Sequence, residues 1–208
     1  MAESELAQTL RDAASGDAGA WTRLVTAYSG RVFGLLVKQC GDRELAEELA
    51  QATFVKVVEK LTEAQTSGAP GAYEERGRFE SWLFRIAMNK LRDEARRKKR
   101  QARTMDMSPG ADREEGSSAM GSMAATAGAG GLGENPVELL SRGEQVQRMQ
   151  ACIETLPEAD REVLYLRHTA GLSFAQIAET LEQPLGTVLA RGHRALGKLK
   201  KMMIDDVA

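Results

Sequence analysis

The residues best suited to do chemistry form a line within the stretch "FESWLFRIAMNKLRDEARRKKR", residues 79–100. Four polar residues follow i, i+4, i+7, i+11 spacing, which places them on one side of a helix: Arg85, Asn89, Arg92 and Arg96. Trp82 falls at the border of that side. Long cationic and amide side chains donate hydrogen bonds to phosphates and bases, and an indole face accepts an unstacked base. The pattern indicates binding of a nucleic acid.

The charge of this stretch is one-sided. From Arg85 to Arg103 the chain carries nine Lys/Arg and two acids, a net of +7, whereas the whole chain has a net charge of −2. The remainder therefore carries −9. A solvated charged face, the simpler alternative, usually mixes signs and gains pairs at i,i+4. A line of like charge costs self-repulsion unless a polyanion relieves it, and DNA is the obvious polyanion.

Other kinds of site find little support. The two cysteines, Cys40 and Cys152, form no CxxC and are interpreted as ordinary buried thiols in a reducing compartment. His168 and His193 have no ligand partners at metal spacing, so we expect neither a metal nor a cofactor. There is no phosphate loop, no nucleophile–base arrangement and no paired carboxylates in a cleft-like context, which argues against an enzyme.

The chain is expected to be cytoplasmic. No apolar run approaches the roughly 20 residues that a membrane span needs. The first ten residues, "MAESELAQTL", have neither the basic nor the apolar region of a secretory signal.

The elements that position the polar line are predicted to be helices, in a domain over residues 1–103. Residues 42–61 form a helix that Asp42 caps, and residues 79–100 form a further helix. The helix over 20–39 has an apolar stripe of Trp21, Leu24, Val25, Tyr28, Val32, Leu35 and Leu36. The stripe of 42–61 is Ala46, Leu49, Ala50, Thr53, Phe54, Val57, Val58 and Leu61. The apolar face of 79–100 is Phe79, Leu83, Ile86, Ala87 and Leu91.

Residues 104–137 are rich in Gly, Ala and Ser and carry five acids against one arginine, which is typical of a flexible acidic linker. Residues 138–208 are helical again. The fold class is therefore all-α, with two small helical domains joined by a linker.

The second domain contains the pattern of a helix-turn-helix. Ser173 is the expected N-cap of a short helix, Phe174 to Leu181; a turn at 182–186 and a longer helix from Thr187 follow. The interior positions are Ile177, Ala178, Leu181, Leu185 and Val188. The second helix is expected to expose Arg191, Arg194, Lys198, Lys200 and Lys201. Two packed helices with a basic tail are the plainer alternative.

Together these blocks resemble the extracytoplasmic-function (group IV) sigma factors of bacterial RNA polymerase. "GDAGAWTRLVTAYSGRVFGLL", "DRELAEELAQATFVKVVEKL" and "GRFESWLFRIAMNKLRDEARRKKR" look like successive parts of sigma region 2. "LPEADREVLYLRHTAGLSFAQIAETLEQPLGTVLARGHRAL" looks like region 4. The resemblance implies a non-catalytic factor that binds core RNA polymerase, recognises −35 and −10 promoter elements and melts the latter.

In this family the helix corresponding to residues 79–100 meets the −10 element. The resemblance thus assigns Trp82, Arg85, Asn89, Arg92 and Arg96 to −10 DNA; for Trp82, an anchor between packed helices is the alternative. Phe79 and Leu83 lie on the apolar face and are expected in the core. The loop over residues 66–77 corresponds to the one that captures a flipped base. Glu47, Glu48 and Gln51 correspond to the surface that binds the β′ clamp helices; a solvated acidic face is the alternative. Ala52 stands where a carboxylate is frequent, and Val58 where tryptophan is frequent.

The region-4 resemblance assigns −35 recognition to Thr187, Arg191, His193, Arg194 and Lys198. Several residues depart from the family pattern and put the −35 preference in question: Glu182, Leu189, Ala190 and Leu196. The implied partners are core RNA polymerase, through the β′ clamp helices and the β flap, and promoter DNA, with an anti-sigma factor as a further partner. The acidic linker either threads the cleft of the polymerase or simply tethers the domains.

A stand-alone helix-turn-helix regulator is the competing hypothesis. It predicts tight binding to duplex DNA without polymerase, usually as a dimer on palindromic half-sites. The acidic helix over 42–61 and the aromatic-basic helix over 79–100 would then have no purpose.

Overall fold

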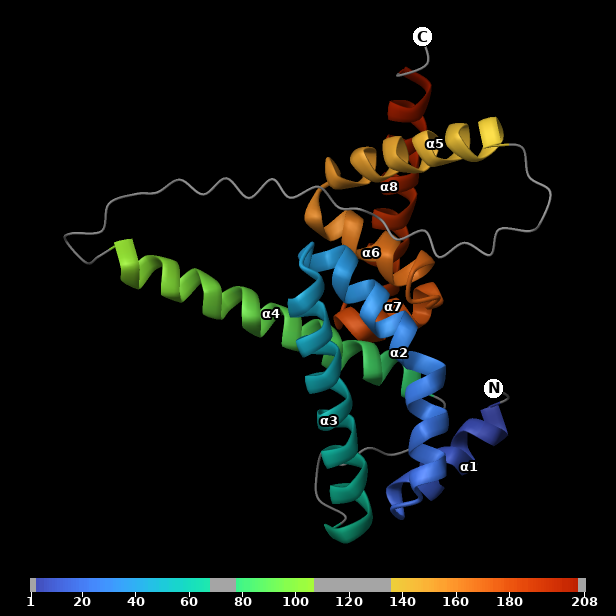
Figure 1. Ribbon diagram of the computed structural model, residues 1–208, viewed down its shortest axis with the longest axis vertical. Helices are drawn as coiled ribbons and strands as arrows, with labels where there is room; N and C mark the ends of the chain where they lie inside the picture. Colours follow the sequence, from blue (N-terminus) through green and yellow to red (C-terminus); the bar gives the residue numbers. More distant parts are fainter. Residues whose placement is uncertain (1–2, 68–77, 107–135, 206–208) are drawn as a thin grey trace. The chain divides into compact units, whose positions relative to one another are not determined.

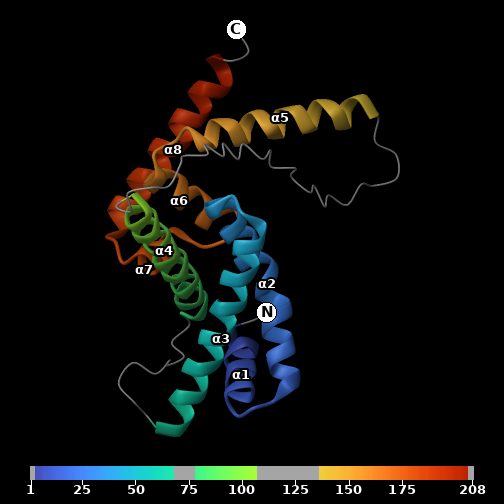
Figure 2. The ribbon, with the colours of Figure 1, turned by 60° about the vertical axis from the view of Figure 1, so that its left-hand side comes forward.

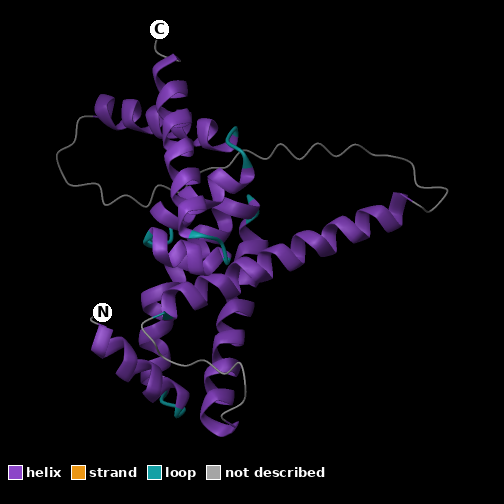
Figure 3. Cartoon of the chain, turned by 180° about the vertical axis from the view of Figure 1, so that it is seen from behind, coloured by secondary structure: helices purple, strands orange, loops and turns teal. Residues whose placement is uncertain are grey.

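The computed structural model describes residues 3–67, 78–106 and 136–205. These ranges contain eight helices and no strand, and Figure 3 shows helices joined by short loops. The all-α prediction is therefore confirmed for the described part of the chain.

The first three helices pack together at the N-terminal end: α1 (Glu3–Ala14), α2 (Ala18–Cys40) and α3 (Arg43–Ser67). Figures 1 and 2 show α2 and α3 side by side, with α1 against their ends. Local chemistry sets the boundaries. Asp17 caps α2 by accepting from the Gly19 amide at 2.8 Å, and Gly41 ends it in a left-handed conformation with φ 69°. The predicted Asp42 cap is confirmed, because its carboxylate accepts from the Leu45 amide at 3.1 Å.

The core between these helices follows the predicted stripes with four exceptions, of which Trp21 and Phe54 are half-buried and Val25 and Val58 are exposed. Leu24, Tyr28, Val32, Leu35 and Leu36 are buried on α2, and Ala46, Leu49, Ala50, Thr53, Val57 and Leu61 on α3. Val25 and Val58 were expected in the core, but their exposed fractions are 39% and 40%. Each lies at the edge of its stripe, where none of the described helices covers it.

Helix α4 (Phe79–Asp106) packs on α2 and α3 through its first half and extends beyond them through its second (Figure 1). It buries Phe79, Leu83, Phe84, Ala87 and Met88. The predicted face was partly wrong, since Ile86 and Leu91 are only half-buried. The face is rotated because α4 rests against α2, α3 and α7 (Phe174–Leu181) at once. The predicted linker begins inside α4, and residues 107–135 lie outside the described residues.

The third block forms α5 (Pro136–Glu154), α6 (Glu158–His168), α7 (Phe174–Leu181) and α8 (Leu185–Asp205). The Ser173 cap is confirmed: Ser173 Oγ accepts from the Gln176 amide, and the Gln176 side chain accepts from the Ser173 amide, a capping box.

Helix α8 begins at Leu185, two residues before the predicted start, because the Pro184 carbonyl accepts from the Thr187 and Val188 amides. Ile177, Leu181 and Val188 are buried as expected and Ala178 is half-buried, but Leu185 is 45% exposed, which corrects that position.

The chain divides into two compact units. The first contains α1 to α4, the end of α6, α7 and the start of α8 up to Val188; the second contains α5, most of α6 and α8 from Leu189. In the first unit Arg31 donates to Glu80 at 2.6 Å and to the Ala170 carbonyl at 2.7 Å. The sequence-based boundaries at 103 and 138 stay a prediction.

The second unit has its own apolar cluster. Leu156, Leu164 and Ala195 are buried together, and Leu199 and Met202 pack against them. This cluster fixes which side of α8 turns inward, and therefore which side faces outward.

Candidate nucleic-acid and partner interfaces

The predicted polar line lies on one continuous helix. Because α4 runs unbroken from Phe79 to Asp106, the i, i+4, i+7, i+11 spacing places its four residues on one side. Asn89 and Arg96 are exposed, and Arg85 and Arg92 are half-buried. Two of the buried residues, Leu83 and Ala87, lie on the other side, so the helix separates a core face from a donor face.

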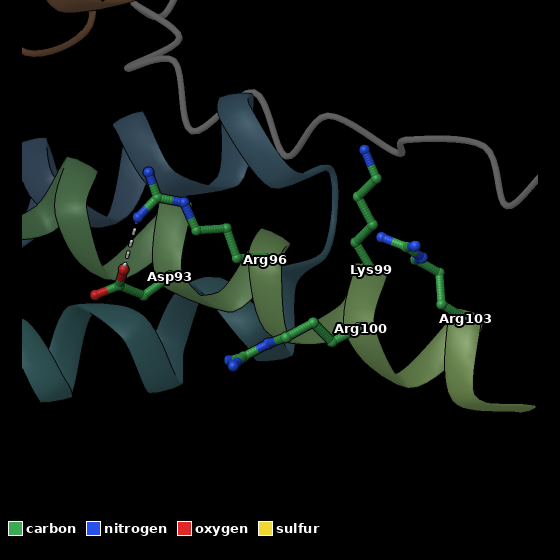
Figure 4. A pocket seen from close by; sticks show the side chains of 5 residues that line it. All are labelled: Asp93, Arg96, Lys99, Arg100 and Arg103. Atoms are coloured by element: carbon green, nitrogen blue, oxygen red, sulfur yellow. Dashed lines mark ion pairs between the residues drawn. The ribbon is translucent and has the colours of Figure 1, made fainter.

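The line continues past the residues that the sequence analysis selected. Lys99 and Arg103 follow Arg96 at i+3 and i+7, so they extend the same side by two turns. Asp93, Arg96, Lys99, Arg100 and Arg103 line an open groove of about 590 Å³. Figure 4 shows these side chains spreading from successive turns of α4. Extending the spacing by two further steps would have found both residues.

Acids on α4 hold two of the cations. Arg96 lies 3.5 Å from Asp93, with both side chains more than 70% exposed. Arg97 lies 2.7 Å from Glu94, and this hydrogen bond raises the pKa of the Arg97 guanidinium above its ordinary value. The exposed Arg96–Asp93 pair contributes little and is screened by salt, so a phosphate can displace it.

The aromatic end of α4 is anchored in the first unit. The Phe79 ring lies 5.3 Å from the Tyr28 ring in an edge-on contact, and the Trp82 ring lies 5.9 Å from Phe79. Phe79 and Leu83 are buried, which confirms their placement in the core, whereas Trp82 is only half-buried. The indole thus packs against Phe79 and keeps part of its surface exposed to solvent.

Arg85 has a partner in α7's terminal turn. Its guanidinium lies 3.2 Å from Glu182, which caps α7 with φ 54°, a left-handed conformation unusual for a residue with a side chain. Arg78 and Glu179 form a second pair at 3.4 Å between the same elements. Both pairs are largely exposed, so they restrain the two arginine side chains only weakly.

A separate apolar groove of about 540 Å³ opens between α2 and α3. Its lining includes Val25, Phe33, Phe54 and Val55, and Glu47 and Gln51 border it. Val55 is 58% exposed, and the misplaced Val25 also belongs here. An apolar trough with polar residues at its edge is typical of a surface that a protein partner covers.

The structure brings together two of the three residues predicted to bind the polymerase. Glu47 and Gln51 share the groove, and Glu47 also lies 3.5 Å from Arg43, whose guanidinium stacks over the Phe33 ring at 5.2 Å. Glu48 is exposed and does not line the groove; its charge acts on Arg97 instead. Sequence reasoning missed Phe33 and Val55, because the groove needs two helices.

The cations of α8 differ in their exposure and in their partners, although all five were expected to be exposed. Arg194 lies 3.2 Å and Lys198 3.8 Å from Asp160, whose side chain is only 4% exposed. Arg191 is half-buried rather than exposed, which corrects that expectation. Thr187 and His193 are exposed, as are Lys200 and Lys201. The buried Asp160 therefore orients the two cations that follow the middle of α8.

Other kinds of site can be assessed in residues 3–67, 78–106 and 136–205. Within these ranges no group of three His, Cys, Asp or Glu could hold a metal ion, and no helix is long and apolar enough to cross a membrane. Both cysteines are half-buried, and burial raises the pKa of the Cys40 thiol. The loop expected to capture a flipped base lies almost wholly outside the described residues.

Comparison with known families gives two matches along the chain. Residues 24–101 match the family described as Sigma-70 region 2, and residues 146–199 match Sigma-70, region 4. The first range contains the α2–α3 groove and most of the cationic line of α4; the second contains the helix-turn-helix.

Similar proteins match this chain over most of its length. The chain is 29% identical over 189 residues to RNA polymerase sigma-H factor of Pseudomonas aeruginosa, covering 90% of this chain and 88% of the relative. It is 27% identical over 203 residues to ECF RNA polymerase sigma factor SigW of Bacillus subtilis, covering 98% of this chain and 99% of the relative. The sigma factor RpoE from Bartonella quintana, solved with the anti-sigma factor NepR, has a similar fold, with 19% identity, a TM-score of 0.58, and 88% and 95% of the two chains covered.

Proposed function

We infer that this chain, which belongs to the extracytoplasmic-function sigma factors of bacterial RNA polymerase, binds core RNA polymerase and directs it to promoters. The observation that carries this inference is the joint presence of two features. The cationic line of α4 begins at an aromatic end inside a region-2 match, and a capped helix-turn-helix follows inside a region-4 match.

The −10 element is proposed to meet α4. Arg85, Asn89, Arg92 and Arg96 would contact phosphates and bases, and Lys99 and Arg103 would extend the phosphate contacts. The exposed side of Trp82 would stack on a base that leaves the duplex. Each arginine held by an exposed acid can change partner, because the phosphate adds attraction that the surface pair lacks.

Core polymerase is proposed to cover the α2–α3 groove. A protein partner would bury Val25, Phe54 and Val55, while Glu47 and Gln51 would form polar contacts at the edge. The β′ clamp helices are the partner proposed for this surface. Glu48, which lies away from the groove, would contribute through its charge rather than by contact in it.

The −35 element is proposed to meet the outer side of α8 through Thr187, Arg191, His193, Arg194 and Lys198. Asp160 holds Arg194 and Lys198 in place, which favours positioning on the DNA backbone. The domain limits 1–103, 104–137 and 138–208 are retained as a proposal, with the β flap as the polymerase partner of the last domain.

The chain itself is proposed to catalyse no reaction, because the polymerase supplies the chemistry, and to act in the cytoplasm, where its DNA lies. Anti-sigma factors are a proposed partner class, since NepR is the partner of the similar fold from Bartonella quintana. The stand-alone regulator is disfavoured because it leaves the α2–α3 groove and the donor face of α4 without a use.

Transcription in vitro tests the proposal. Purified bacterial core RNA polymerase is supplied with genomic fragments of the host, with and without this chain. We expect discrete start sites that require the chain and share two upstream elements. Tight binding of the chain alone to duplex DNA, together with no new transcripts, would instead support the stand-alone regulator.

A further inference from the structure

The outer side of α8 carries two leucines that face solvent. Leu189 is 45% exposed and Leu196 50%, whereas the residue before each, Val188 and Ala195, is completely buried. Residues seven apart on an α-helix differ by about 20° in direction, so both leucines emerge on the same side. A single exposed leucine is ordinary, but two aligned on a helix rich in cations indicate an apolar group in the partner.

Two cations of α8, Arg194 and Lys198, lie at the opposite edge of its exposed side from the leucines. Arg194 and Lys198 both turn to the carboxylate of Asp160, at 3.2 Å and 3.8 Å. At about 100° per residue, Arg194 lies roughly 160° around the helix from Leu196. These donors are held at the margin of the helix, which suits phosphates better than base edges.

Charge complementarity identifies the partner that α8 accepts. Between Leu185 and Ile204 the helix carries five Lys or Arg and no acid, so its surface attracts a polyanion. A helix that lies in the major groove meets phosphates at its margins and base edges between them. The C5-methyl group of thymine is the one apolar group that the base pairs present there.

We propose that Leu189 and Leu196 recognise thymine methyl groups in the −35 element, so that this promoter class is selected by apolar contact as well as by hydrogen bonds. The inference rests on the proposed function, since it names the chemistry by which the same helix reads its element.

Replacing thymine with deoxyuridine removes only the methyl group and keeps every hydrogen-bonding atom. A promoter found in the transcription experiment is prepared with each −35 thymine replaced in turn. The affinity of the complete holoenzyme is then measured for each duplex. One buried methyl corresponds to about a fourfold change in affinity. We expect about that loss at one or two positions with the unchanged protein.

Variants connect each position to a leucine. In Leu189→Ala and Leu196→Ala holoenzymes, the sensitivity to deoxyuridine should disappear at the position that the missing side chain contacts. Ile204→Ala is the matched control, because Ile204 is 57% exposed in the last turn of the same helix. This control should keep the full sensitivity at every position.

The remaining outcomes distinguish a failure of the methyl contact from a failure of the proposed function. If promoter-directed transcription persists but no deoxyuridine changes affinity, or the sensitivity survives in both leucine variants, the methyl contact is wrong and the proposed function stands. Weaker assembly of Leu189→Ala and Leu196→Ala with core polymerase would show that the leucines contact protein, which also overturns the inference. Absence of any promoter-directed transcription would count against the proposed function itself.

Discussion

Removing the distal half of the α4 cationic line should make promoter binding less sensitive to salt. The perturbation is Arg96→Ala, Lys99→Ala and Arg103→Ala together, three exposed cations that line one groove (Figure 4). Each lost phosphate contact lowers the slope of log K against log salt by about 0.9 for duplex and about 0.7 for single strands. Three contacts therefore remove about 2 to 3 units of slope.

The magnitude is large enough to measure. Between 50 and 200 mM salt, a slope difference of that size means that the unchanged holoenzyme loses roughly 20- to 40-fold more affinity than the triple variant. The loss of the Arg96–Asp93 pair adds little, because that pair is exposed and screened. Alanine also favours a helix, so α4 should remain folded.

The assay is fluorescence anisotropy of a labelled promoter with holoenzyme across a salt series. The control is Arg11→Ala, Lys56→Ala and Lys60→Ala, which removes the same charge from α1 and α3. We expect the control to keep the original slope, and circular dichroism to show equal helicity. If the triple α4 variant has the slope of the control, these cations contact no phosphates and the placement of DNA along α4 is wrong.

Three further predictions concern single positions. Val55→Asp should weaken binding to core polymerase by at least tenfold in a pull-down titration without lowering Tm, because Val55 is exposed in the α2–α3 groove. Glu182→Gly should raise stability by about 1 kcal/mol in urea unfolding, since glycine accepts a positive φ; loss of the exposed Arg85 pair offsets only part of this. Cys40 should be alkylated more slowly than a free thiol at pH 8, with a rate that still rises above pH 9, because burial raises its pKa and leaves less thiolate.

Each of these has an outcome that contradicts it. A polymerase affinity for Val55→Asp equal to that of the unchanged chain would remove the groove from the interface. A lower stability of Glu182→Gly would show that the Arg85 pair outweighs the backbone strain. Alkylation of Cys40 at the rate of a free thiol would mean that the thiol is less shielded than its half-buried position indicates.

Local features were predictable from the sequence because their causes are local. The Asp42 and Ser173 caps follow from one side chain and the amides within three residues of it, and both are confirmed. The short helix Phe174–Leu181 was predicted with its boundaries for the same reason. The start of α8 was misplaced by two residues, because Gly186 looked like part of the turn while Pro184 supplies the first carbonyl.

Features that depend on two elements were not predictable in this way. The periodicity of α4 gives an apolar side, but its contacts with α2, α3 and α7 select Phe84 and Met88 over Ile86 and Leu91. The α2–α3 groove likewise needs residues from both helices. Val25 was expected in the core because the apolar periodicity of one helix does not show how much of its stripe a neighbouring helix covers.

We propose that α4 opens the −10 element only together with core polymerase. Permanganate reactivity of promoter thymines, which reports unstacked bases, tests this directly. We expect thymines of the −10 element to react only when core polymerase and this chain are both present, and the α4 triple variant to lower that reactivity at 200 mM salt. Melting by core polymerase alone would contradict the account, as would a stable promoter complex whose −10 thymines never react.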